Sequence, residues 1–264
     1  KVLAEKLSAS LPQLRDLINA RTVHLDRVLE QALADGVKQV VCCGVGLDMS
    51  MFRMAAQAPE YHAKYYELDL PPMLAERSRS LAQIPNLPVL DRQMIEVDLI
   101  KDDLQEQLQN HSDFQCEEKT LFILEGCSMY FDPEQNRRLF EQLRRLVQAS
   151  NGLLWADFVS ERVVQGGVQA AAVHEFFEEM EYMGEAFIFG QDNPQWYLQD
   201  LGFTDIESVV AREWLASNDP LMDEYCFAVA TAKLPAQNVR RALPQTISND
   251  THANWPTNLL YSNE

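Results

Sequence analysis

The stretch Val40-Val41-Cys42-Cys43-Gly44-Val45-Gly46-Leu47-Asp48 decides the fold of this chain. It is an apolar run that ends in a Gly-x-Gly turn, and a second short run, Tyr65-Tyr66-Glu67-Leu68-Asp69, follows about one βα unit later. A strand that ends in glycines lets a ligand approach the bare backbone, and an acidic residue at the tip of the next strand can accept hydrogen bonds from two ribose hydroxyls. Together the two segments predict a nucleoside-binding α/β fold.

Strands and helices alternate along the whole chain. Short apolar runs predict strands at residues 38–43, 63–68, 93–98, 120–125, 152–158, 204–210 and 225–232. Helical spacing, capping residues and prolines predict helices at residues 11–35, 48–58, 71–82, 100–110, 133–150, 160–183 and 194–201. This order predicts a parallel sheet with helices on both faces, then a helical excursion and a closing pair of strands.

The predicted elements form one domain over residues 1–233. Residues 160–195 lie between the fifth strand and the last two, so they are expected to form a helical lid over the carboxyl edge of the sheet. Four glycines in this segment permit hinge motion: Gly166, Gly167, Gly184 and Gly190. Residues 234–264 are polar and lack periodicity, which predicts a wrapped or partly disordered tail.

The charge of the chain argues against two classes of partner. Its 264 residues include 22 Lys and Arg and 40 Asp and Glu, which gives a net charge of −18. Nucleic acids and anionic membranes attract basic surfaces, so we expect neither as a partner. The acidity itself is typical of a well-solvated protein surface.

Cysteine and histidine spacing argues against a metal site. The five cysteines form no C-x-x-C pair, and the five histidines are scattered, so neither a disulfide framework nor a zinc site is expected. Free cysteines favour a reducing, cytoplasmic setting. No apolar run approaches the roughly 18 residues of a membrane span. No signal peptide is visible, and Lys1 stands where a methionine would open a complete chain, so the true N-terminus is left open.

The glycine turn favours a ligand without phosphate. Gly44-Val45-Gly46 is followed by Leu47-Asp48-Met49, so the third glycine of the dinucleotide fingerprint is missing. A carboxylate at Asp48, near the start of the next helix, would also repel a pyrophosphate placed there. S-adenosylmethionine (SAM) fits these limits, because it carries adenosine, a sulfonium and an amino-acid head.

Three carboxylates stand at predicted strand ends, and each has two interpretations. Asp69 is placed to hold a ribose, or else it caps the helix that follows. Asp98 is placed to accept a hydrogen bond from an adenine amino group, or else it starts the helix at 100–110. Glu125 is placed to pair with a ligand ammonium, or else it pairs with a nearby arginine such as Arg53.

The motifs, taken in order, resemble the leucine carboxyl methyltransferase family, which includes bacterial O-methyltransferases of polyketide tailoring. The matching pieces are Arg21-Thr22 with Asp26, Gln39 to Asp48 with Phe52-Arg53, Glu67-Leu68-Asp69-Leu70-Pro71, Thr120 to Gly126 with Met129-Tyr130, Phe189-Gly190, Leu201-Gly202-Phe203 and Tyr225-Cys226. The resemblance covers roughly residues 15–232. The chain departs from the family at Met49 and Ser50, where the family usually has Thr-Arg, and at Val45, where it usually has Ala.

The resemblance implies a Rossmann-like class I SAM-dependent methyltransferase and a set of site residues. Arg21 would grip the SAM carboxylate; the alternative for this residue is a surface salt bridge to Asp26. Gly44 and Gly46 would let the methionine part of SAM cross the end of the strand. Asp69 would bind the ribose, and Asp98 with the backbone of Leu99 would bind the adenine. Glu125 would bind the ammonium of SAM, and Tyr130 would line the site of methyl transfer. Glu125 and Tyr130 are the implied catalytic residues, and no metal is implied.

The predicted activity is methylation of an oxygen, a carboxylate or a hydroxyl, on a small polyketide-like molecule or a peptide. An ionised carboxylate needs no general base, whereas a hydroxyl acceptor needs one, and His174 in the lid is the candidate. The alternative for His174 is a solvated helix residue. The alternative function, motivated by Met49 and Ser50, is a catalytically silent SAM-binding or protein-interaction module. A nucleotide-dependent oxidoreductase is disfavoured by the missing third glycine. The acceptor and the oligomeric state stay open.

Overall fold

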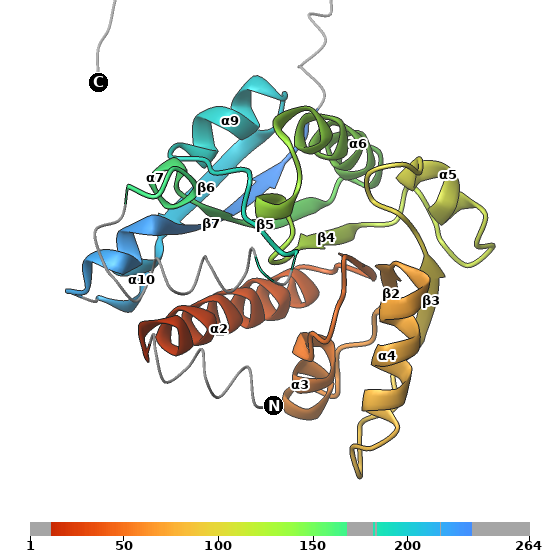
Figure 1. The fold of residues 1–264 in the computed structure, drawn as a ribbon. Coiled ribbons are helices and arrows are strands. Elements are labelled where there is room, and N and C mark those ends of the chain that lie inside the picture. The colour runs from red at the N-terminus through yellow and green to blue at the C-terminus, as the bar shows by residue number, and fades with distance from the viewer. Residues whose placement is uncertain (1–11, 168–181, 183, 217, 234–264) are drawn as a thin grey trace, which may run out of the picture. The chain divides into compact units, whose positions relative to one another are not determined.

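Seven strands form one sheet in the order β3-β2-β1-β4-β5-β7-β6 (Figure 1). Their bounds are β1 Gln39–Cys43, β2 Lys64–Asp69, β3 Arg92–Glu96, β4 Thr120–Leu124, β5 Leu153–Val159, β6 Thr204–Val210 and β7 Tyr225–Thr231. Strands β1 to β5 are parallel, and β7 pairs antiparallel with both β5 and β6. This computed structural model describes residues 12–167, 182, 184–216 and 218–233.

Helices cover both faces of the sheet, as the alternating pattern predicts. Their bounds are α2 Pro12–Ala34, α3 Ser50–Gln57, α4 Pro71–Leu81, α5 Leu104–Gln109, η1 Ser128–Tyr130, α6 Pro133–Ser150, α7 Glu161–Val164, α9 Pro194–Asp200, α10 Ala211–Leu215 and η2 Pro220–Glu224. One apolar core lies under α5, α6 and α9, and the other lies under α2, α3, α4 and α10 (Figure 1). Every residue of β1 and β4 is buried, because these central strands are covered on both sides.

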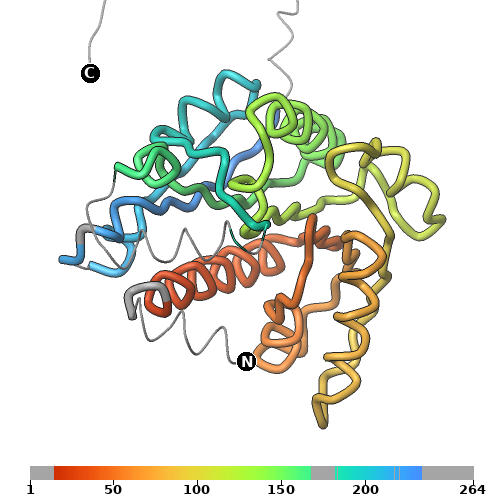
Figure 2. Tube along the Cα trace, in the orientation of Figure 1, coloured from red at the N-terminus to blue at the C-terminus, as the bar shows by residue number. Residues whose placement is uncertain are grey.

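Segments from the two ends of the described chain pack together. Figure 2 shows α2, in red, beside α10, in blue. His24 of α2 lies edge-on to Trp214 of α10 and stacks on Phe227 of β7, with centroid separations of 4.7 and 4.8 Å. The first helix is thereby joined to the last strand of the sheet.

Local capping explains where the long helix α6 begins. Asp132 accepts a hydrogen bond from the backbone N–H of Gln135, and the Gln135 side chain accepts one from the backbone N–H of Asp132. Pro133 occupies the first helical turn, where its missing N–H costs nothing. The predicted helix over residues 133–150 is confirmed.

One predicted helix is interrupted and another is shorter than expected. Within the segment predicted as a helix at 160–183, α7 covers Glu161–Val164, and Gly166 then turns the chain with a φ of +68°. The helix predicted at 100–110 begins only at Leu104, where the Asp103 side chain caps it. Residues 168–181, which include His174, lie outside the described residues, as do 1–11 and the predicted tail at 234–264.

Gly190 has a steric role, and the hinge role expected for it stays a prediction. A Cβ at this position would lie 2.5 Å from the Ser160 carbonyl oxygen and 2.7 Å from the Glu161 backbone. Gly190 therefore allows two segments to approach closely. The chain around it is anchored as well, since Gln191 N–H donates to the Val159 carbonyl at 2.7 Å. Among the helices of the described part, none is long and apolar enough to cross a membrane.

Candidate functional site

The order of the strands reverses between β1 and β4, and a cleft of about 490 Å³ opens at this point. In doubly wound sheets, ligands bind at the carboxyl ends of strands at such a reversal. The lining comes from α2, from β1 with the loop after it, from α3, and from β4 with the turn after it. The lining residues include five of the predicted site residues, namely Arg21, Gly44, Gly46, Glu125 and Tyr130.

Two glycines of the loop after β1 are required for different reasons. Gly44 has a φ of +72°, and a Cβ there would lie 2.5 Å from the Cys127 sulfur. Gly46 has a φ of +48°, but a Cβ there would meet nothing within 4 Å. Gly46 thus presents bare backbone to open space. Val45 between them is buried, so the departure from the family's alanine is taken up by the core.

Asp69 stands at the end of β2 and holds the glycine loop. One carboxylate oxygen accepts a hydrogen bond from the Gly46 N–H and the other from the Leu70 N–H, each at 2.8 Å. Helix α4 is capped at Leu70 without any side-chain hydrogen bond, so the helix-capping alternative for Asp69 is wrong. Each Asp69 oxygen keeps a further lone pair for another donor.

Asp98 and Leu99 follow β3 and stand outside the cleft lining. The Asp98 carboxylate accepts a hydrogen bond from the Ile100 N–H at 3.1 Å and pairs with Lys101 at 2.6 Å, which lowers its pKa. The Leu99 side chain packs toward Gly44, 3.5 Å from where a Cβ would stand. Asp98 thus shapes the turn after β3. This is close to its alternative interpretation, in which Asp98 starts the next helix, although α5 begins later, at Leu104. The role of Asp98 in adenine binding stays a prediction.

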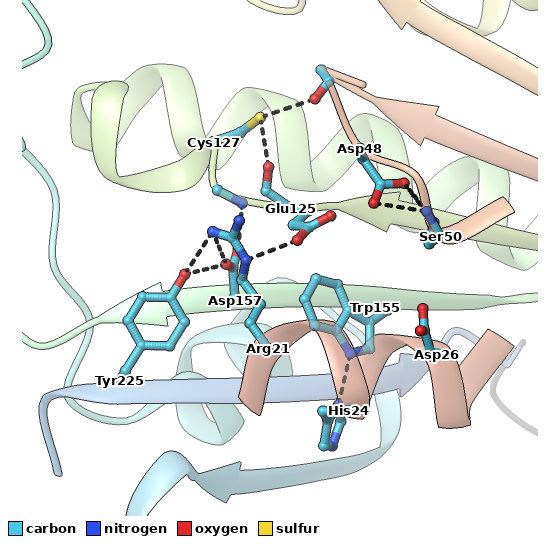
Figure 3. Close-up of polar contacts among 12 residues, drawn as sticks. Arg21, His24, Asp26, Asp48, Ser50, Glu125, Cys127, Trp155, Asp157 and Tyr225 are labelled. Carbon is cyan, nitrogen blue, oxygen red and sulfur yellow. Dashed lines mark hydrogen bonds and ion pairs between the residues drawn. The ribbon is translucent and has the colours of Figure 1, made fainter. Parts of the chain in front are cut away.

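Arg21 reaches from α2 into a cluster of acidic groups (Figure 3). Its Nε lies 2.8 Å from a Glu125 oxygen, and its Nη1 lies 3.6 Å from Asp157 Oδ2 and 3.4 Å from the Tyr225 hydroxyl. The surface pair predicted as the alternative, Arg21 with Asp26, is wrong. Asp26 instead accepts two hydrogen bonds from Arg53, both at 2.8 Å.

The structural alternative for Glu125, a pair with a nearby arginine, is what the structure shows, but the arginine is Arg21 and not Arg53. Gly126 makes room for this contact: a Cβ there would lie 3.0 Å from the Arg21 Nη1. The turn after β4 is thereby built around the arginine.

Asp157 and Tyr225 complete the cluster, and sequence reasoning missed both as site residues. Asp157 is fully buried in β5, where it accepts hydrogen bonds from the Gly126 N–H at 2.8 Å and from the Tyr225 hydroxyl. A carboxylate inside the apolar run Leu153–Val159 was the available signal, because unpaired charges are rarely buried. The Tyr225 partnership spans 68 residues and has no local signal.

Acidic groups outnumber arginines around the cleft. Arg21 faces Glu125 and Asp157, while Arg53 faces Asp26 and, at 3.9 Å, Asp48. Burial raises the pKa of Glu125 to about 7 against the lowering effect of Arg21. Burial also raises the pKa of Asp157. The cluster therefore favours a ligand that brings positive charge, because such a ligand would stabilise the ionised carboxylates.

Tyr130, in η1, lines the cleft. Its ring packs edge-on against Phe187 with a centroid separation of 5.2 Å. Burial, followed by the charge of Glu185, raises the pKa of Tyr130 to about 12, so its hydroxyl stays protonated at neutral pH. No cluster of metal-binding side chains occurs in the part of the chain that the structure describes.

Comparison with known proteins identifies the family. The family model for leucine carboxyl methyltransferase matches residues 2–144. A "Putative S-adenosyl-L-methionine-dependent methyltransferase" of Mycobacteroides abscessus is 29% identical over 199 residues, which are 75% of this chain and 59% of that protein. The chain thus spans about three-fifths of the length of that curated relative.

Solved structures share the fold. A crystal structure described as a putative methyltransferase from Thermobifida fusca YX covers 88% of each chain with a TM-score of 0.63 and 18% identity. Magnesium protoporphyrin IX methyltransferase from Synechocystis PCC 6803, solved with bound SAH (S-adenosylhomocysteine), covers 83% of this chain and 86% of its own with a TM-score of 0.50 and 13% identity. The chain has the Rossmann-like fold of class I SAM-dependent methyltransferases and belongs to the leucine carboxyl methyltransferase family.

Proposed function

We propose that this protein is a SAM-dependent O-methyltransferase whose acceptor is a carboxylate on a small molecule or a peptide. The observation that carries the proposal is the row of groups at the ends of neighbouring strands. Asp98, Asp69, Gly44 and Glu125 stand at or just after the ends of β3, β2, β1 and β4, which are consecutive in the sheet. In this order the row offers groups for a base, a ribose and an amino-acid head, the parts of SAM.

The residues of the cleft fit SAM group by group. Asp69 has lone pairs for ribose hydroxyls, and the bare backbone at Gly46 leaves space beside it. Glu125 offers a carboxylate to an ammonium, and Arg21 offers a guanidinium to a carboxylate. Bound SAM would supply a methyl group on a sulfonium, and transfer to a carboxylate oxygen would leave S-adenosylhomocysteine and a methyl ester.

The charge of the cleft supports this cofactor. SAM carries a sulfonium and an ammonium against one carboxylate, a net charge of +1 by its chemistry. The clusters around Arg21 and Arg53 each hold two carboxylates for one arginine. A cationic ligand gains from this excess, whereas the pyrophosphate of a dinucleotide would be repelled.

The acceptor is proposed to be an ionised carboxylate because the described lining offers no free base. Tyr130 keeps its proton, and burial holds the pKa of the Cys127 thiol well above its usual range. Of the two carboxylates in the lining, Glu125 is engaged by Arg21. The other, Asp48, accepts hydrogen bonds from the backbone N–H and the hydroxyl of Ser50. A carboxylate is already nucleophilic at neutral pH, so the enzyme needs only to align it. The protonated Tyr130 hydroxyl is suited to donate a hydrogen bond to such an acceptor.

A labelled-methyl transfer assay tests the acceptor class. Purified protein is incubated with methyl-labelled SAM and three matched acceptor sets: free carboxylic acids, the same acids as amides, and phenols. The proposal expects base-labile methyl ester from the acids only. Transfer to phenols instead would overturn the carboxylate assignment. SAM binding with no transfer to any set would favour the catalytically silent alternative.

A further inference from the structure

A buried arginine of α4 binds two carbonyl groups of the glycine loop. Arg77 is fully buried, and its Nη1 donates to the carbonyl oxygens of Asp48 at 2.7 Å and Gly46 at 3.2 Å. Its Nη2 donates to Glu67 Oε1 at 2.9 Å. One guanidinium therefore ties the loop after β1 to the strand β2.

Glu67 has a second arginine, which does not touch the loop. Arg92 Nη1 donates to Glu67 Oε2 at 2.6 Å, and its side chain is 29% exposed. Both guanidiniums lie over the Phe52 ring, 6.0 Å away for Arg77 and 5.8 Å for Arg92. The two arginines thus share a carboxylate and a ring, and they differ in whether they bind the loop carbonyls.

Both backbone polar atoms of Gly46 are held by hydrogen bonds. The Gly46 N–H donates to Asp69, while the Gly46 carbonyl accepts from Arg77. Glu67 and Asp69 are two residues apart on β2 and so lie on the same face of that strand. One strand therefore fixes the loop twice, directly through Asp69 and indirectly through Arg77.

A buried ion pair is a poor source of stability, because desolvation of both charges offsets their attraction. What Arg77 provides is geometry, since a planar guanidinium can bind a carboxylate and two carbonyls at once. We propose that Arg77 is a positioning residue that orders the Gly44–Asp48 loop in its ligand-binding conformation, held in place by Glu67. This inference rests on the proposed binding of SAM in the cleft.

The expected effect is on binding and not on methyl transfer. A loop that is disordered before binding must be ordered by the ligand, which weakens the affinity. Arg77→Lys keeps a positive charge beside Glu67 but cannot bind Glu67 and both carbonyls together. We expect the Kd and KM for SAM to rise by about 10- to 100-fold, the cost of fixing one or two residues. The kcat at saturating SAM should stay within about twofold, because the loop is ordered once SAM is bound.

The test is calorimetric titration of SAM into the wild type, Arg77→Lys and the matched control Arg92→Lys, with steady-state kinetics on each. Arg92→Lys alters the same carboxylate without touching the loop, so it should bind SAM as the wild type does. An Arg77→Lys affinity equal to that of the wild type overturns the inference. Equal losses in both variants also overturn it, because the effect would then come from Glu67. A wild type that binds no SAM refutes the proposed function itself.

A double variant covers the case in which Arg77→Lys fails to fold. Glu67→Gln with Arg77→Met removes both buried charges: the neutral glutamine can still accept a hydrogen bond from Arg92, and methionine fills the space of the arginine stem. We expect this protein to unfold at a temperature close to that of the wild type and still to show the 10- to 100-fold loss of SAM affinity. A folded double variant with wild-type affinity contradicts the positioning role.

Discussion

Arg21 joins the fold and the proposed binding site in one side chain. Its guanidinium contacts Glu125 and Asp157 within the protein, and it also lines the cleft. Asp157 remains a permanent partner deep in β5, whereas Glu125 is 13% exposed and accessible to a ligand. A zwitterionic amino-acid head therefore finds both an arginine and a carboxylate whose charges are already paired.

Replacing Arg21 tests which part of the ligand it binds. We expect Arg21→Ala to weaken SAM and S-adenosylhomocysteine while leaving adenosine nearly unaffected, because only the first two carry a carboxylate. Calorimetry with the three ligands measures this. Arg27→Ala, on the same helix but packed over Trp214, is the control and should bind all three as the wild type does. Equal losses for the three ligands would mean that Arg21 only supports the local fold.

The raised pKa of Glu125 predicts that SAM affinity depends on pH. With a pKa of about 7, Glu125 becomes protonated as the pH falls and can no longer pair with an ammonium. We expect SAM affinity to fall by about tenfold between pH 8 and pH 6, since binding then requires loss of a proton. Calorimetry across this range measures the slope. Glu125→Gln should bind weakly at every pH, and a wild-type slope in that variant would assign the proton to another group.

At the scale of helices and strands, the sequence predicts the features that depend on neighbouring residues. The seven strands lie within about two residues of their predicted bounds, because buried apolar runs punctuated by Gly and Pro leave few alternatives. The insertion of β7 between β5 and β6 was not predicted, since pairing between distant strands has no local pattern. The short helix α10 also escaped prediction, because a five-residue helix carries too little periodicity.

The residues of the candidate site also differ in whether a local sequence pattern indicates them. Gly44, Gly46, Asp69 and Glu125 could be predicted as candidates, because they stand at or just after the ends of strands. Asp157 and Tyr225, the other partners of Arg21, could not be predicted, because α2, β5 and β7 come together only in the folded chain. Arg77 lies in α4, whose polar sequence indicates an exposed helix. The burial of the Arg77 side chain depends on its contacts with Glu67 and with the loop carbonyls.

The close packing at Gly190 makes a prediction about this element. Gly190→Ala places a methyl group 2.5 Å from the Ser160 carbonyl oxygen, and backbone atoms cannot move away cheaply. We expect a loss of about 1–3 kcal/mol in the free energy of unfolding. Gly167→Ala is the matched control, because its Cβ would stand at an ordinary 3.4 Å from the Arg162 carbonyl oxygen. Denaturant unfolding compares the two, and equal stabilities would show that the chain at Gly190 gives way.

For the whole molecule, His24 connects the first helix to the sheet. Its Nδ1 accepts a hydrogen bond from the Trp155 indole at 2.9 Å, so the ring is neutral with its proton on the other nitrogen. Burial, and then the charge of Arg27, lowers the pKa of His24 to about 4. In the unfolded chain histidine titrates near pH 6.5. Between about pH 6.5 and pH 4, His24 is therefore protonated in the unfolded chain but stays neutral in the folded protein.

This difference in the pKa of His24 between the folded and unfolded states predicts that acid lowers the free energy of unfolding. Stability contributed by neutral His24 is fully present above about pH 6.5 and is lost as the pH falls toward 4. His24→Asn keeps an acceptor for Trp155 but does not titrate. We expect its urea midpoint to fall less than that of the wild type between pH 7 and pH 4.5. Parallel declines in the two proteins would place the acid sensitivity elsewhere.

The arrangement of the whole sheet underlies the central proposal, that SAM lies across the ends of β2, β1 and β4 with its ribose at Asp69. The most direct test is calorimetric titration of SAM into the wild type and Asp69→Ala, with Asp113→Ala, a surface carboxylate paired to Lys64, as the control. We predict one SAM per wild-type chain and a loss of about 1–3 kcal/mol in Asp69→Ala, because ribose hydroxyls and the Gly46 N–H are left without their acceptor. The Asp113→Ala protein should bind as the wild type does. Unchanged SAM affinity in a folded Asp69→Ala protein, or no SAM binding by the wild type, would contradict the account.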